Sequence, residues 1–436
     1  MNELENFIYK LNKITESEDF DLVQARQIIK ELNEFLFANY DGIGQTADNL
    51  EYFSDFHKYW EKHHKEILNA NIDSDACSKV ADALHSIYLI SKGNAFSHVY
   101  ETNNLTAEEI CRIRILTANQ DFRGSRSFSE LAEIYKSDNS IFDENIILDE
   151  PENFLNNIQI TGLSQNDKRI NYARSIAKFI IESKTTPFNL IEQYDYDVAE
   201  FKSALVSYFQ SGYGNKKADM FIRDMVVLGV WKNVKNFDAI NVASDVNTIK
   251  VALRTGILKT AIPLVSSFLD IFCYQYGYID MMSALAWRKV WEIWKEKYPK
   301  ETIASPCLLD YFIYDIIGKQ FCKEILHIFH GEDCGHTFKW HSGRNKTCQI
   351  CYKLGKRSKA HSISNILPCT DEEGNIAIEK IEFAIQNHLS ECPFKEICKQ
   401  NGNIQLLPPK SISIWGQTGW TTAYTKKEQG GGGLMA

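Results

Sequence analysis

The stretch SGYGNKKADMF, residues 211–221, decides the fold. Two glycines enclose one tyrosine, two lysines follow, and amphipathic segments lie on both sides, at 197–210 and 218–231. A tight turn between two helices needs a residue that tolerates positive φ, and glycine does so without steric cost. The pattern therefore predicts a helix–hairpin–helix motif.

This hairpin predicts an anion site. The amides of Gly212, Gly214 and the first turn of the following helix are expected to point outward, where they suit a phosphate group. Such a site holds a nucleic-acid backbone and reads no base sequence. A plain turn between two helices is the alternative explanation of the same glycines.

The rest of the body is predicted to be helical, because apolar residues recur at spacings of three and four. Strand-like alternation is nearly absent before residue 330, so the fold class is all-α. The acidic stretch 137–154 is expected to be irregular. The expected helices are 22–37, 76–90, 107–124, 160–184, 197–210, 218–231, 243–258, 263–277, 281–298 and 308–322, with one more at 377–389.

Bulk composition limits the possible classes of protein. The chain has 436 residues, 11 cysteines and a net charge of −9, which allows one to three domains. That charge argues against a surface covered with phosphate-binding cations, but a local basic face is compatible with it. The sequence shows no long apolar run and no secretory signal, so we expect a cytoplasmic, nucleoid-associated protein without a membrane segment. The cysteines are then thiols or metal ligands.

Three separated blocks resemble the helix–hairpin–helix DNA glycosylase superfamily, the group of endonuclease III and 8-oxoguanine glycosylase. They are ITGLSQNDKRINYARSIAKFI (160–180), GYGNKKA (212–218) and SDVNTIKVALRTG (244–256), in the order of the family. A shorter block, RILTANQDF (114–122), is similar to the helix end and loop that fill the gap left by a flipped base.

The resemblance covers about residues 105–325 and implies a two-lobed glycosylase core there. Outside it, apolar periodicity predicts an N-terminal helical extension, and the cysteines and histidines predict a C-terminal metal-binding module. The expected domains are 1–104 for the extension, 105–325 for the core, 326–410 for the metal-binding module and 411–436 for a flexible tail.

The resemblance also implies the reaction. A modified or damaged base is flipped out of double-stranded DNA and its N-glycosidic bond is cleaved, which leaves an abasic site. Lys216 falls at the nucleophilic lysine of members that also act as AP lyases, and Asp245 at the catalytic aspartate. Phosphate binding is the alternative role of Lys216, and helix capping that of Asp245. The implied DNA-binding residues are Gly212, Tyr213, Gly214, Asn215, Lys217, Asn119, Gln120, Lys250 and Arg254.

Departures from the family pattern mean that the sequence does not identify which base is excised. The interval between Lys216 and Asp245 is long, as in the archaeal 8-oxoguanine branch, the usual proline before the hairpin is missing, and Asn247 replaces the usual histidine. Oxidised purine is one candidate base. Glucosylated hydroxymethylcytosine, the substrate of related bacterial anti-phage enzymes, is the other.

Cysteine and histidine spacing predicts a structural metal. Cys348 and Cys351 have chelate spacing, and Cys334 with His336 complete a zinc set. Cys392 and Cys398 resemble the end of an iron–sulfur motif that lacks one cysteine here, so a [4Fe–4S] cluster is the alternative cofactor. Two assignments stay open: one site from Cys348, Cys351, Cys392 and Cys398, or a zinc knuckle at 334–351 with a second site downstream. Further candidate ligands are Cys369, His388 and Cys322.

Two other functions fit the same sequence. A non-catalytic helix–hairpin–helix module would bind DNA through the hairpin and through the basic segment 334–359, which contains no acidic residue. The other alternative is a glycosylase that acts on free nucleosides or nucleotides, for which the hairpin and the basic segment would have no evident role.

Overall fold

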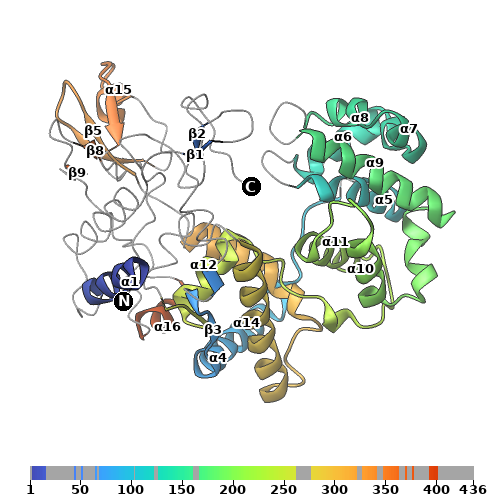
Figure 1. Cartoon of the computed structure of the whole chain (residues 1–436), viewed down its shortest axis with the longest axis horizontal. Coiled ribbons are helices and arrows are strands. Elements are labelled where there is room, and N and C mark those ends of the chain that lie inside the picture. Colours follow the sequence, from blue (N-terminus) through green and yellow to red (C-terminus); the bar gives the residue numbers. More distant parts are fainter. Residues whose placement is uncertain are drawn as a thin grey trace. The chain divides into compact units, whose positions relative to one another are not determined.

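The structure is a computed structural model of the whole chain (Figure 1). It describes residues 2–15, 44–45, 51–52, 64–65, 68–102, 104–121, 126–160, 166–261, 276–321, 327–340, 347–362, 369–370, 376–377 and 392–400. Helices predominate in this part of the chain and the strands are short, which confirms the predominantly helical class.

The chain divides into two compact units. The hairpin unit consists of Ala81–Ser244 and Trp287–Ile313, and the composite unit of Met1–Val80, Asp245–Ala286 and Tyr314–Ala436. The domain boundaries expected after residues 104, 325 and 410 stay predictions.

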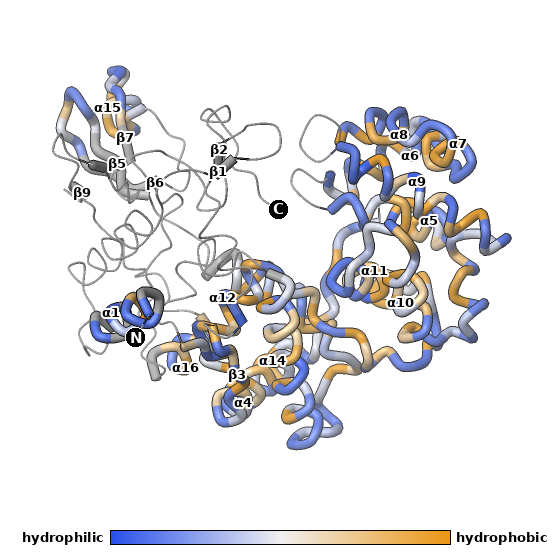
Figure 2. The backbone as a smooth tube through the Cα atoms, in the orientation of Figure 1, coloured by the Kyte–Doolittle hydropathy of each residue, from blue (hydrophilic) through white to orange (hydrophobic). Residues whose placement is uncertain are grey.

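The hairpin unit consists of short helices around one apolar core. Its elements are η1 (Asn94–Phe96), α5 (Ala107–Thr117), η2 (Ala118–Gln120), α6 (Phe128–Ser137), η3 (Asn139–Phe142), α7 (Glu144–Asp149), α8 (Pro151–Asn157), α9 (Asn166–Ser183), η4 (Phe188–Tyr194), α10 (Val198–Ser207), α11 (Asn215–Val227), η5 (Phe237–Ala239) and η7 (Pro306–Leu309). Figure 2 shows hydrophobic and hydrophilic residues interleaved along these helices, as expected where one face of each helix is buried.

The centre of that core lies beside the hairpin. Phe201 of α10, Phe221 of α11 and Trp231 are almost fully buried. The ring of Trp231 meets the other two edge-on, with centroids 5.1 Å from Phe201 and 5.5 Å from Phe221. Burial of three large aromatic rings is a strong stabilising contribution, so α10 and α11 are held together independently of their turn.

The expectation of an irregular stretch at 137–154 was wrong. The structure forms η3, α7 and α8 there. Asp138 and Asp143 accept backbone hydrogen bonds as N-caps, and Pro151 occupies the first turn of α8. Each of these residues favours a helix start, so the acidic composition marks a series of short helices.

The composite unit contains helices and four small sheets. Its helices are α1 (Glu3–Thr15), α12 (Val246–Thr255), α15 (Gln349–Lys353) and α16 (Lys395–Gln400). Its strands are β1 (Gly44–Gln45), β2 (Glu51–Tyr52), β3 (Asn71–Ile72), β4 (Leu258–Lys259), β5 (His327–Gly331), β6 (Thr337–Trp340), β7 (Ala360–Ser362), β8 (Cys369–Thr370) and β9 (Ile376–Ala377). All pairs are antiparallel, and the one three-stranded sheet among the described residues has the order β6-β5-β7.

Three helical segments pass from one unit into the other: α4 (Ser74–Ser91), α14 (Tyr276–Lys297) and the π-helical η8 (Phe312–Phe321). The helices expected at 76–90 and 281–298 are therefore confirmed. Those expected at 22–37, 263–277 and 377–389 lie wholly or almost wholly outside the described residues. A search of the described helices finds none with the length and apolar character needed to cross a bilayer.

Candidate functional site

The hairpin turn is fixed by Ser211 and Gly212. Ser211 Oγ donates to Leu205 O over 2.8 Å and accepts the Tyr213 amide over 3.2 Å. Gly212 has φ 74°, and a Cβ on it would lie 2.6 Å from Cγ of Tyr172. Only glycine satisfies both conditions, which confirms the expected glycine turn at this position.

Gly214 meets no such requirement. It is the N-cap of α11 with φ −87°, and a Cβ on it would have nothing within 4 Å. No side chain caps the first turn of α11, and Asn215 and Lys216 beside it are exposed. An uncapped helix N-terminus with an adjacent cation favours an anion.

The two adjacent lysines occupy different environments. Lys216 is exposed, whereas Lys217 is half-buried and its Nζ donates to the carbonyl oxygen of Asn119 over 2.6 Å. Burial, with a smaller contribution from the nearby Arg169 and Lys216 and against the attraction of Asp121, lowers the pKa of Lys217 to about 8. The lysine whose environment favours a neutral amine is therefore Lys217.

Asn119 and Gln120 are buried behind the hairpin. Asn119 Nδ2 donates to Ser211 O over 3.0 Å and to Tyr172 O over 3.1 Å, and Gln120 Nε2 donates to Arg169 O over 3.1 Å. Their side-chain oxygens accept no hydrogen bond from the described residues. In this conformation both amides join η2 to α9, and insertion into DNA would require them to leave those contacts.

Three further residues expected at DNA are also buried. Tyr213 is 3% exposed, and its hydroxyl donates to Ile115 O over 2.8 Å. Lys250 and Arg254 of α12 are 5% and 1% exposed. The structure thus places their side chains inside the protein, and their contact with DNA stays a prediction.

Asp245 is the N-cap of α12. Its Oδ1 accepts the amides of Asn247 over 2.8 Å and Thr248 over 2.9 Å, and its Oδ2 accepts Asn247 Nδ2 over 3.1 Å. Thr248 Oγ1 in turn accepts the Asp245 amide, which completes a capping box. The capping role weighed for Asp245 is confirmed, and its catalytic role is untested. Asp245 belongs to the composite unit and Lys216 to the hairpin unit.

A buried cluster of ion pairs links the residue that follows η2 to α5 and α11. Arg114 reaches Asp121 over 3.2 Å and Asp224 over 3.1 Å, and the Tyr100 hydroxyl donates to Asp224 over 3.1 Å. Burial raises the pKa of Asp121 despite the attraction of Arg114. Sequence reasoning missed these residues, although charged side chains at apolar positions of α5 and α11 were a visible signal.

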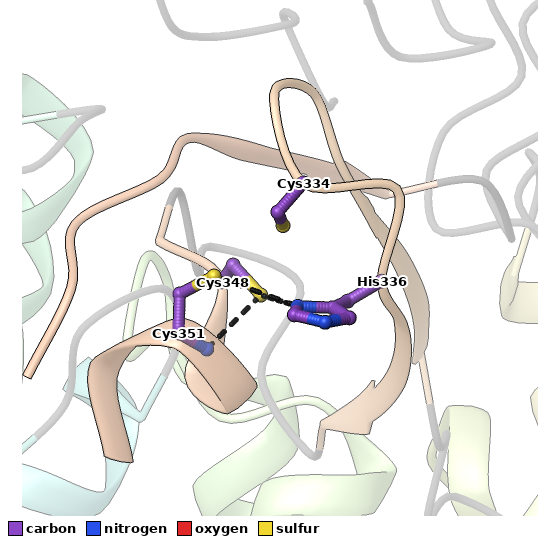
Figure 3. A group of neighbouring side chains, drawn as sticks. All are labelled: Cys334, His336, Cys348 and Cys351. Carbon is purple, nitrogen blue, oxygen red and sulfur yellow. Dashed lines mark hydrogen bonds between the residues drawn. The ribbon is translucent and has the colours of Figure 1, made fainter. Parts of the chain in front are cut away.

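The C-terminal cluster can hold a metal ion. Cys334 and His336 come from the turn between β5 and β6, and Cys348 and Cys351 from the start of α15, with all four ligand atoms within 4.8 Å of one another (Figure 3). His336 Nδ1 lies 3.7 Å from Cys348 Sγ and 3.5 Å from Cys351 Sγ. A tetrahedral metal with bonds of about 2.0–2.3 Å separates its ligands by about 3.5–3.8 Å, so the spacing suits such an ion.

Two residues that the sequence did not single out shape this cluster. A Cβ on Gly331 would lie 2.3 Å from Cys334 Sγ, so only glycine leaves room for that sulfur. The hydroxyl of Ser358 holds the pKa of the Cys334 thiol below its ordinary value, at about 6. Gly331 leaves space for the sulfur, and the lowered pKa favours a thiolate at Cys334, which is the form that binds metal.

The observed grouping decides between the two ligand sets that the sequence left open. Cys334, His336, Cys348 and Cys351 form one group, and Cys392 and Cys398 are buried but belong to no such group among the described residues. The single site made of Cys348, Cys351, Cys392 and Cys398 is therefore not the arrangement found. The side chain of Cys369, together with His388 and Cys322, lies outside the described residues.

No protein-family model matches the chain, and a comparison with curated proteins finds no significant match.

Proposed function

We propose that the chain is a DNA glycosylase that flips a modified or damaged base out of duplex DNA and leaves an abasic site. The observation that carries the proposal is the α10–α11 hairpin, with its glycine-locked turn, an uncapped α11 N-terminus, and Gly214 and Lys216 exposed beside it. This arrangement suits a DNA phosphate. The order of the three family-like blocks adds support from the sequence.

In the proposed reaction Asp245 stabilises positive charge at C1′ of the sugar. Water adds to C1′, the glycosidic bond breaks with its electron pair on the base nitrogen, and that nitrogen takes up a proton. The capping hydrogen bonds orient the Asp245 carboxylate without neutralising it.

Lyase activity would need a neutral lysine amine. Lys216 holds the family position, whereas Lys217 has the lowered pKa. In either case the amine attacks C1′ in place of water and displaces the base, whose nitrogen takes the electron pair and a proton. The C1′–O4′ bond then breaks to give a Schiff base as O4′ takes a proton, and loss of a C2′ proton expels the 3′ phosphate and breaks the strand. Borohydride reduction followed by peptide mapping would identify which lysine is attached to the sugar.

We further propose that Cys334, His336, Cys348 and Cys351 hold zinc as a structural ion. Zinc is colourless whereas an iron–sulfur cluster is not, so the absorption spectrum and metal content of the purified chain test this directly.

A second candidate is a DNA-binding module without chemistry. The hydrogen bonds by which the Asp245 carboxylate caps α12 favour it, because they give this side chain a structural role. Abasic-site formation distinguishes the two, measured with an aldehyde-reactive probe on unmodified DNA, oxidised DNA, and phage DNA with hydroxymethylated or glucosylated cytosine. Aldehydes on one substrate would establish a glycosylase and its base. Salt-dependent duplex binding without aldehydes on any substrate would leave the binding module.

A further inference from the structure

The metal cluster carries an exposed basic loop, Tyr352–Lys359, with the sequence YKLGKRSK. Tyr352 and Leu354 are each 66% exposed. The four cations of the loop, Lys353, Lys356, Arg357 and Lys359, are also exposed. The loop therefore presents two apolar side chains among four positive charges.

The metal ligands fix the shape of this loop. The amides of Leu354 and Lys356 both donate to Cys351 O, over 3.0 and 2.9 Å, and the Cys348 amide donates to Ser358 O over 2.8 Å. Gly355 turns the chain with φ 71°. Both ends of the basic loop are thus hydrogen-bonded to residues that bind the ion, so the loop keeps its shape only while the cluster is formed.

Within the described segments 327–340 and 347–362, the loop has few acidic neighbours in sequence. The sequence from Cys334 to His361 contains no Asp or Glu. Glu332 and Asp333 are exposed on the neighbouring turn, where the Glu332 amide donates to Lys359 O over 2.9 Å. With two acids against four cations, this segment has a positive charge balance.

We propose that the basic loop binds a single-stranded nucleic acid, with phosphates at Lys353, Lys356 and Arg357 and an unpaired base on the Tyr352 ring. Cations track a phosphate backbone, and an exposed aromatic ring stacks on a base. A duplex conceals the faces of its bases, so the exposed Tyr352 and Leu354 favour the single strand. The proposal holds whether or not the chain excises bases.

The test measures fluorescence anisotropy of a labelled oligothymidylate of about 12 nucleotides with the full metal-loaded chain at several salt concentrations. Tyr352→Ala is expected to weaken binding about tenfold at every salt concentration, because one stacked base is lost. Arg357→Gln is expected to reduce the slope of log affinity against log salt by about 0.7, as one phosphate contact is lost. Lys136→Gln, at an exposed lysine of α6, is the matched control and should bind as the wild type does.

Metal content is measured for every variant, since none of these residues is a ligand and each variant should retain the ion. Removal of the ion from the wild type should weaken binding at least as much as Tyr352→Ala does. The proposal is overturned if Tyr352→Ala and Arg357→Gln bind like the control. Equal affinity for duplex and single strand, unaffected by Tyr352→Ala, would overturn the single-strand assignment. Stronger binding to polyglutamate than to the oligonucleotide would indicate an acidic protein partner instead.

Discussion

The α10–α11 hairpin and the β5–β6–α15–β7 segment are both tight turns that display cations, but different forces hold them. Behind the hairpin lies the apolar core of its unit, with Phe201, Phe221 and Trp231. Behind the C-terminal turn the buried cluster consists of Cys348, Cys351 and Ala360, two of which belong to the group that could hold a metal ion. Burial stabilises the first turn, whereas the second has a small apolar cluster and, in our proposal, depends on bonds to zinc.

Of these experiments, metal removal should produce the largest difference in hydrogen-exchange protection between the two regions. Structural zinc contributes about 10–16 kcal/mol to small zinc-binding folds, more than three buried side chains can replace. Chelation should make the amides of 327–362 exchange rapidly while those of α10 and α11 keep their protection. Hydrogen exchange read by mass spectrometry measures both in one sample. Unchanged protection at 327–362 would show that the cluster is not needed for folding.

Gly212→Ala should damage the hairpin next most strongly. The new Cβ would overlap the Tyr172 ring in a left-handed conformation, at a cost of about 2–4 kcal/mol. Gly214→Ala is the matched control and should cost less than about 1 kcal/mol, since it changes only an N-cap with open space around it. Urea unfolding measures both, and equal losses would contradict the difference between the two glycines.

Gly331→Ala should weaken metal binding about 10–100-fold, because its Cβ would occupy the space of the Cys334 sulfur. Gly355→Ala provides the comparison. It introduces backbone strain at φ 71° but meets no atom within 4 Å. Competition with a chromophoric chelator gives both affinities, and an unaffected Gly331→Ala protein would remove Cys334 from the ligand set.

The smallest expected effect is the dependence of unfolding stability on pH through Lys217. Its pKa of about 8 lies below the ordinary 10.5, so the folded state holds this proton less tightly than the unfolded state. The free energy of unfolding should therefore rise as pH increases from about 8 to 10.5. The full pKa difference corresponds to about 3 kcal/mol, and solvent screening of the half-buried amine reduces the expected rise to about 1–2 kcal/mol. Lys217→Met should lose that increase and Lys216→Met should keep it, both followed by chemical unfolding across this range. Identical pH profiles would mean that Lys217 is not buried in solution.

The sequence predicted the parts of the fold that depend on local pattern. The helices on both sides of the turn, the left-handed Gly212 and the group of Cys334, His336, Cys348 and Cys351 follow from spacing and glycine chemistry. The helix ends at the turn were misplaced, since α10 ends at Ser207 instead of residue 210 and α11 begins at Asn215 instead of residue 218. Each signal lies within a short stretch of chain, which is why it can be recognised without the structure.

Burial was the part that the sequence did not predict. Tyr213, Lys250 and Arg254 were assigned to DNA from their types and positions, yet the protein covers them. The relation between Lys217 and Asn119 depends on η2 packing against α11, about a hundred positions away in the chain. The sheet β6-β5-β7 was missed because its strands are short.

The most direct test of the proposed glycosylase is Asp245→Asn, measured for unfolding stability and abasic-site formation in the same preparation. Asparagine caps a helix about as well as aspartate does, so the α12 cap should survive within about 0.5 kcal/mol while the negative charge is lost. If Asp245 is catalytic, the variant should have unchanged stability, retained duplex binding and no abasic-site formation. Abasic-site formation by Asp245→Asn at the wild-type rate would contradict a catalytic Asp245 and leave that residue with its capping role alone.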